Sequence, residues 1–202
     1  MDTATLETST ESGDHHGGRP GGRPALLTVG TVVWLASELM FFSGLFAAYF
    51  TVRGLSEGPW PPEGVELKPA IAGVFTLFLV ASSGTMQFAV QTIREGDRHK
   101  FRFWLVTTLL LAAVFLGNQL REYAGLSFQV DSNAYGSAFY LMTGFHGLHV
   151  LGGMVAMVVL LGRSVNAGFG AAETPAVEVV SYYWHFVDVV WVGLFATLYL
   201  LK

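Results

Sequence analysis

The chain has 202 residues, of which 52% are hydrophobic and only 13% are charged. A soluble domain would carry roughly 25% charged residues, so this composition indicates a surface embedded in lipid. Cysteine is absent and the net charge is −4, which excludes disulfides, thiolate-bound metals and a basic nucleic-acid-binding surface. We therefore expect an integral membrane protein with no nucleic acid among its partners.

Residues 1–24 are polar and rich in Gly, Ser and Thr, and we expect a disordered cytoplasmic tail. Residues 25–202 contain five apolar stretches, each near the roughly 20 residues that cross a bilayer as a helix. The stretches lie near 26–52, 69–92, 103–122, 136–162 and 178–201. The predicted fold is all-α, a bundle of five transmembrane helices that forms one domain.

The connections between these stretches carry turn signals and a charge bias. Pro59, Pro61 and Pro62 interrupt the first connection, the charged run 94–102 is expected to be a short turn, and 168–175 separates the last two stretches. Seven lysines and arginines fall on the side of the N-terminus and four on the opposite side. Because positive residues favour the inner face, we expect a cytoplasmic N-terminus and a C-terminus outside the cell membrane.

Three of the five stretches contain titratable side chains well inside the apolar segment. They are Glu38, His146, His149, His185 and Asp188. An ionised Asp near the bilayer centre costs about 2.5–3.5 kcal/mol on insertion scales, so such a residue is normally turned inward and given a partner. His185 and Asp188 are spaced i, i+3, which places both on one helix face.

Three interpretations of these polar residues remain open from spacing alone. The favoured one is that they satisfy one another and the backbone and so fix the packing of the helices. A second is contact with protons or lipid head groups, with Glu38 as an exchangeable buried carboxyl. A third is a metal site, but the Glu-x-x-His motifs of a di-iron bundle are missing. Haem ligation by His146 and His185 has only a weak signal, since histidine pairs alone are common.

Three motifs resemble the cytochrome c oxidase subunit III family. Two of them are Gly-Phe-His-Gly-Leu-His-Val at 144–150 and Tyr-Trp-His-Phe-Val-Asp-Val-Val-Trp at 183–191. The third, Ser-Glu-Leu-Met-Phe-Phe at 37–42, is similar to the family's helix with a buried, carbodiimide-reactive glutamate. The resemblance covers residues 26–202 and is greatest to the five-helix actinobacterial members. The family's long form has seven spans, and this chain resembles five of them.

The resemblance implies a non-catalytic subunit of an aerobic oxidase that reduces oxygen to water and pumps protons. Haem and copper belong to subunits I and II of this family, so no catalytic residue, metal ligand or cofactor site is expected here. The implied roles are assembly with subunit I, phospholipid binding and support of proton uptake. Glu38 matches the family's buried carboxylate. The matches to its intramembrane contacts with helices or lipid are His146, His149, His185 and Asp188.

The expected partners are oxidase subunits I and II, phospholipids and, for an actinobacterial chain, a cytochrome bc-type complex in a supercomplex. Two alternatives stay open. Subunit III of a quinol oxidase shares the His-Gly-Leu-His and Trp-His-Phe motifs, although Glu38 favours the cytochrome c branch. A stand-alone proton-coupled carrier is the other, but the sequence shows no internal repeat of the kind that such carriers usually carry.

Overall fold

The computed structural model describes residues 26–65, 67–165 and 169–201, so the predicted tail at 1–24 lies outside the described residues. The described part of the chain consists of helices joined by short connections. The main helices are α1 (Leu26–Leu55), α2 (Pro69–Arg94), α3 (Arg98–Gly125), α4 (Ala134–Ser164) and α5 (Thr174–Phe195). Single turns η1 (Ala171–Glu173) and η2 (Ala196–Leu200) extend α5 at its two ends. Within the described ranges five helical segments are long and apolar enough to cross a membrane, which confirms the predicted fold class.

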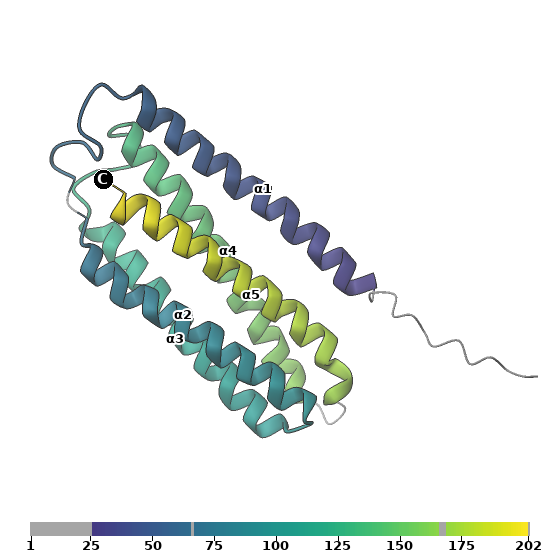
Figure 1. Cartoon of the computed structure of the whole chain (residues 1–202). Helices are drawn as coiled ribbons and strands as arrows, with labels where there is room; N and C mark the ends of the chain where they lie inside the picture. Colours follow the sequence, from purple (N-terminus) through teal and green to yellow (C-terminus); the bar gives the residue numbers. More distant parts are fainter. Residues whose placement is uncertain (1–25, 66, 166–168, 202) are drawn as a thin grey trace, which may run out of the picture.

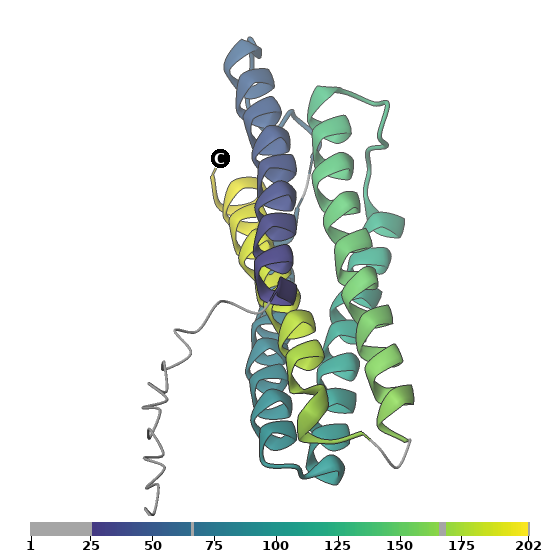
Figure 2. The same ribbon diagram turned by 90° about the vertical axis from the view of Figure 1, so that its right-hand side faces the viewer.

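The helices form an elongated bundle in which consecutive helices run antiparallel (Figure 1). α2 and α3 make the most extensive contact and form one side of the bundle, while α1 lies along the opposite edge. α5 contacts α1, α2 and α4 and therefore occupies the centre. Figure 2 shows that α1 is displaced along the bundle axis and extends beyond the other helices at the end where the chain terminates.

The turn between α2 and α3 is shorter than the charge pattern predicts. α2 ends at Arg94 and α3 already begins at Arg98, so only residues 95–97 of the predicted turn are outside a helix. Asp97 explains this correction, because its side chain accepts a 3.0 Å hydrogen bond from the Lys100 backbone N–H and caps α3. The same hydrogen bond holds the pKa of Asp97 below its ordinary value.

Other helix ends also extend past the apolar stretches read from the sequence. α3 reaches Gly125 and α5 begins at Thr174, whereas the sequence places these boundaries at 122 and 178. Hydropathy marks the part of a helix that fits the hydrocarbon, and a helix continues into the polar interface until a cap or a turn ends it. Asn133 supplies such a cap for α4 by accepting a 2.7 Å hydrogen bond from Gly136 N–H.

Two buried tryptophans of α5 fix its position in the bundle. The indole N–H of Trp184 donates to Ser82 Oγ at 3.0 Å, and that of Trp191 donates to Thr76 Oγ1 at 2.9 Å, so both bind α2. On the other side of α5, Trp184 packs against Gly153 of α4. A Cβ atom at position 153 would lie 2.7 Å from Trp184 Cε3, so only glycine permits this close approach of α4 and α5.

Candidate functional site

Glu38 of α1 and His149 of α4 form a polar pair at the edge of the bundle. Glu38 Oε2 lies 3.1 Å from His149 Nε2, although the two residues are 111 positions apart. Both side chains are partly exposed, with 23% of Glu38 and 17% of His149 accessible. The pair therefore joins α1 to α4 at an edge of the bundle that the other described helices do not fully cover.

The hydrogen bonds of His149 define where its protons lie. His149 Nδ1 is 2.7 Å from the carbonyl oxygen of Phe145, which can only accept, so Nδ1 carries a proton and donates it. Nε2 then either accepts a proton from a neutral Glu38 carboxyl or donates one to the Glu38 carboxylate. One proton is thus shared between Glu38 Oε2 and His149 Nε2, and moving it between these atoms requires no change of partner.

Aromatic side chains surround His149 and hold the pair in place. The ring of Phe42 meets the imidazole edge-on with centroids 4.9 Å apart, and Phe41 stacks at 6.3 Å. Tyr183 of α5 donates its hydroxyl proton to the His149 carbonyl oxygen at 2.9 Å, and its ring stacks on Trp34 of α1 at 5.1 Å. α1, α4 and α5 therefore meet at this point.

His185 and Asp188 of α5 meet at one serine of α2. His185 Nδ1 is 2.9 Å from Ser83 Oγ, and Ser83 Oγ also makes a close contact with Asp188 Oδ2. The spacing of three residues places both α5 side chains on the face that contacts α2, as the sequence predicts for their common face. Asp188 is buried, and no described residue provides a hydrogen bond to its second oxygen, Oδ1.

The shared hydroxyl limits the protonation states of this second cluster. Ser83 has one hydroxyl proton and two neighbours that can accept it. If Ser83 donates to Asp188, His185 Nδ1 must carry a proton and donate to Ser83; if Ser83 donates to His185, Asp188 must carry a proton. Ser83 thereby couples the protonation of His185 to that of Asp188.

His146 belongs to neither cluster. It lies one turn before His149 on α4 but is almost completely buried, between Phe115 of α3 and Trp191 of α5. Its ring centroid is 4.9 Å from that of Trp191 and 6.1 Å from that of Phe115. Neither ring nitrogen has a hydrogen-bond partner among the described residues.

Comparison of the sequence with known proteins identifies the family of this chain. The sequence model described as "Cytochrome c oxidase subunit III" matches residues 6–202. The chain belongs to the cytochrome c oxidase subunit III family. A curated relative from Nocardia farcinica, named probable cytochrome c oxidase subunit 3, is 51% identical over 183 residues, which cover 89% of this chain and 90% of the relative. Similar proteins are the probable subunit 3 of Mycobacterium leprae, 50% identical over the same shares, and the subunit 3 of Corynebacterium diphtheriae, 47% identical over 89% and 90%.

In this subunit III chain, four of the five residues singled out from the sequence form two separate pairs, and the fifth is buried between aromatic rings. Glu38 and His149 pair across α1 and α4, His185 and Asp188 share Ser83, and His146 is isolated. In the part of the chain that the structure describes, no group of three or more His, Asp or Glu side chains is placed to hold a metal ion.

Two hydrogen-bond partners of the candidate residues do not follow from the sequence. Ser83 was one of several hydroxyl and amide side chains in its apolar stretch, and only its contact with α5 distinguishes it. Tyr183 begins the 183–191 motif, and the sequence gives no sign that its hydroxyl binds the backbone of His149. The adjacent serines Ser82 and Ser83 are the available sequence signal, because hydroxyl side chains inside a span often hydrogen-bond to another helix.

Proposed function

We propose that this chain is a non-catalytic membrane subunit of an aerobic cytochrome c oxidase, the complex that reduces oxygen to water and pumps protons. The match of the subunit III family across residues 6–202 carries the proposal. The similar relatives named above are all described as cytochrome c oxidase subunit 3, so the quinol oxidase alternative is not favoured. A stand-alone carrier is likewise disfavoured by family membership.

The proposal assigns the redox chemistry to other chains. Subunits I and II carry the haem and copper groups, and this chain packs against subunit I and binds phospholipid. The similarity to relatives from Nocardia, Mycobacterium and Corynebacterium supports a further partner, a cytochrome bc-type complex in a supercomplex.

The proposed orientation has the N-terminus in the cytoplasm and the C-terminus outside the cell membrane. The distribution of positive charge supports it. Arg94 and Arg163 close α2 and α4 at the same end of the bundle as Arg102, which donates to Ser164 Oγ at 3.1 Å. This is the more basic end, which favours the cytoplasmic side of a membrane.

Glu38 is the residue that we assign to proton support. It can pass a proton to His149 Nε2 or receive one without a change of hydrogen-bond partner, because His149 Nδ1 stays bound to Phe145. Its partial exposure at the edge of the bundle leaves the pair accessible from the protein surface. The pair can therefore hold a proton at the accessible edge of the bundle, and we assign it to the support of proton uptake by subunit I.

The test of the oxidase assignment is purification of the chain with its native partners, followed by an optical spectrum. We expect co-purification with haem-a and copper-bearing subunits. A haem-b/o complex that lacks a copper-bearing subunit II would move the assignment to a quinol oxidase. Isolation of the chain alone, together with solute transport in vesicles, would overturn the oxidase assignment.

The test of the Glu38 assignment is the Glu38→Gln variant of the assembled oxidase. We expect slower proton uptake and a shorter working lifetime during turnover, because glutamine neither releases nor binds a proton. Glu57→Gln is the matched control, since Glu57 is an exposed glutamate beyond the end of α1. A Glu38→Gln oxidase that turns over, pumps and lasts like the wild type would remove this role.

A further inference from the structure

A cavity lies between the beginning of α2 and the end of α3, and none of its lining residues belongs to either polar cluster. Its volume is about 390 Å³. The lining residues include Lys68, Ile71, Asn118, Arg121, Glu122 and Leu126. Its lining residues lie at the end of the bundle where the chain terminates, near the level at which a membrane-spanning helix leaves the hydrocarbon.

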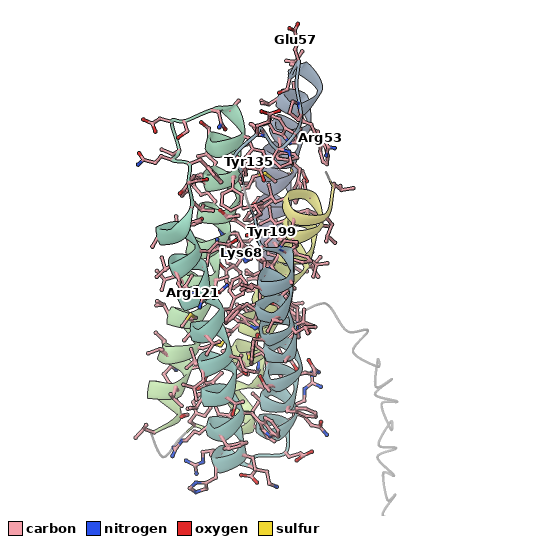
Figure 3. All side chains as sticks on the ribbon, turned by 90° about the vertical axis from the view of Figure 1, so that its left-hand side faces the viewer. Arg53, Glu57, Lys68, Arg121, Tyr135 and Tyr199 are labelled. Atoms are coloured by element: carbon pink, nitrogen blue, oxygen red, sulfur yellow. The ribbon has the colours of Figure 1, made fainter. Side chains whose placement is uncertain are left out.

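Two cations face this cavity. Arg121 donates to Asn118 Oδ1 at 2.8 Å, and its guanidinium lies over the ring of Phe75, with 5.9 Å between Cζ and the ring centroid. These two contacts fix the guanidinium while leaving other N–H groups to donate. Lys68 Nζ makes no hydrogen bond or ion pair with any described residue. Figure 3 shows Lys68 before the start of α2 and Arg121 near the end of α3, and both residues line the cavity.

The carboxylate that lines the cavity has a partner elsewhere. Glu122 accepts a 3.0 Å hydrogen bond from the hydroxyl of Tyr199, which belongs to η2 at the end of the chain. Among the described residues that line the cavity there are two cations and one carboxylate, which gives this set one excess positive charge. A fixed guanidinium beside a lysine that has no partner among the described residues is suited to a phosphate, which accepts charge-assisted hydrogen bonds from both.

Below the cavity, both helices present apolar side chains to the membrane. On α2, Ile71, Val74 and Phe78 follow at helical spacing and are all exposed. On α3, Val114 and Leu110 lie one and two turns deeper than Asn118 and are also exposed. A molecule with its phosphate in the cavity would therefore have apolar surface along which acyl chains can lie.

We propose that the Lys68–Arg121 cavity binds the phosphate of an anionic phospholipid in the leaflet at the C-terminal end of the bundle. The excess of one positive charge favours a lipid whose phosphate is not balanced by an amine. The inference rests on the membrane placement in the proposed function but on none of the oxidase partners. It concerns α2 and α3, whereas the proton-support pair lies between α1 and α4.

The test counts phospholipids on the purified oxidase complex after reconstitution in nanodiscs of phosphatidylcholine with a tenth of phosphatidylglycerol. Native mass spectrometry is expected to find one more phosphatidylglycerol on the wild type than on the Lys68→Gln/Arg121→Gln double variant. Each single variant is expected to retain this lipid about tenfold more weakly, since each loses one charge-assisted contact. Lys68→Arg keeps the charge and is expected to keep the lipid.

Arg53→Gln is the matched control, because Arg53 is an arginine near the same end of the bundle that binds the Leu201 carbonyl and not the cavity. Equal phosphatidylglycerol counts in wild type and double variant, or equal losses with Arg53→Gln, would overturn the proposal. A third outcome is that inorganic phosphate binds the lipid-free wild-type complex but not the double variant, while the phosphatidylglycerol counts are equal. That outcome would assign the site to free phosphate and overturn the proposed lipid site. The haem-a spectrum of the same samples reports separately on the oxidase assignment.

Discussion

The two polar clusters of this subunit use similar side chains in opposite surroundings. Glu38 and His149 meet at the edge of the bundle, and only 11% of the 18-residue apolar segment of α1 is buried. His185 and Asp188 of α5 meet Ser83 of α2, and 44% of the 18-residue apolar segment that contains α5 is buried. The comparison teaches that titratable residues inside membrane spans do not share one environment. From the proposed function, we expect the pair at the edge to exchange protons and the hydrogen bonds in the centre to serve the packing of helices.

The substitution with the largest expected effect tests how tightly α4 and α5 are packed at the centre of the bundle. Gly153→Ala would place a Cβ against the buried ring of Trp184 and is expected to destabilise the subunit by about 1–3 kcal/mol. Gly44→Ala is the control on α1, where an added Cβ meets nothing within 4 Å. Thermal unfolding of the purified complex measures both variants. Equal unfolding midpoints would show that the α4–α5 contact is not more rigid than the edge.

Removing the carboxylate of the central cluster is expected to have the next largest effect. Asp188→Ala leaves Ser83 and His185 with one acceptor fewer, and intramembrane hydrogen bonds average about 0.6 and reach about 1.7 kcal/mol. We expect weaker retention of the subunit during detergent titration, with an intact haem spectrum. Asp188→Asn keeps an acceptor oxygen and should lose less, and His185→Ala should fall between the two. Loss of a haem or copper signal in any of them would contradict a packing role.

Chemical labelling separates the two carboxyls without changing the chain. A hydrophobic carbodiimide should modify Glu38 faster than Asp188, on the order of tenfold, because Asp188 reacts only after a local opening of the helices. Mass spectrometry of the labelled peptides measures both rates in one sample. Equal rates would mean that the centre opens as readily as the edge, and the contrast between the clusters would fail.

The smallest effect concerns a carboxyl outside both clusters, at the turn between α2 and α3. Because the pKa of Asp97 is lowered in the folded chain, its cap contributes stability at neutral pH and loses it as the pH falls through that lowered value. Unfolding midpoints of the wild type should therefore decline slightly more below about pH 4 than those of Asp97→Asn, which caps without titrating. An identical acid dependence in both proteins would show that this cap has no measurable role.

Much of the fold follows from composition, because a span must be long and apolar and the five stretches meet both conditions. The partners inside the membrane do not follow in the same way. His146 and His149 are one turn apart on α4, yet one is enclosed by Phe115 and Trp191 while the other reaches Glu38. The rotation of α4 about its own axis determines which of the two histidines is enclosed and which reaches Glu38. The same holds for the choice of Ser83 on α2, since hydropathy carries no information on helix rotation.

The peripheral position of α1 has a consequence for how the chain is made. α1 is synthesised first, but it docks on α4 and α5, which are synthesised last. Its anchors are the Glu38–His149 pair and, about 16 Å further along the helix, the hydroxyl of Tyr49, which donates to the Thr197 carbonyl. Until α4 is synthesised, α1 therefore lacks its main docking surface, and Glu38 lacks the hydrogen-bond partner that the described structure gives it. An arrest of translation before α4 is expected to leave α1 undocked.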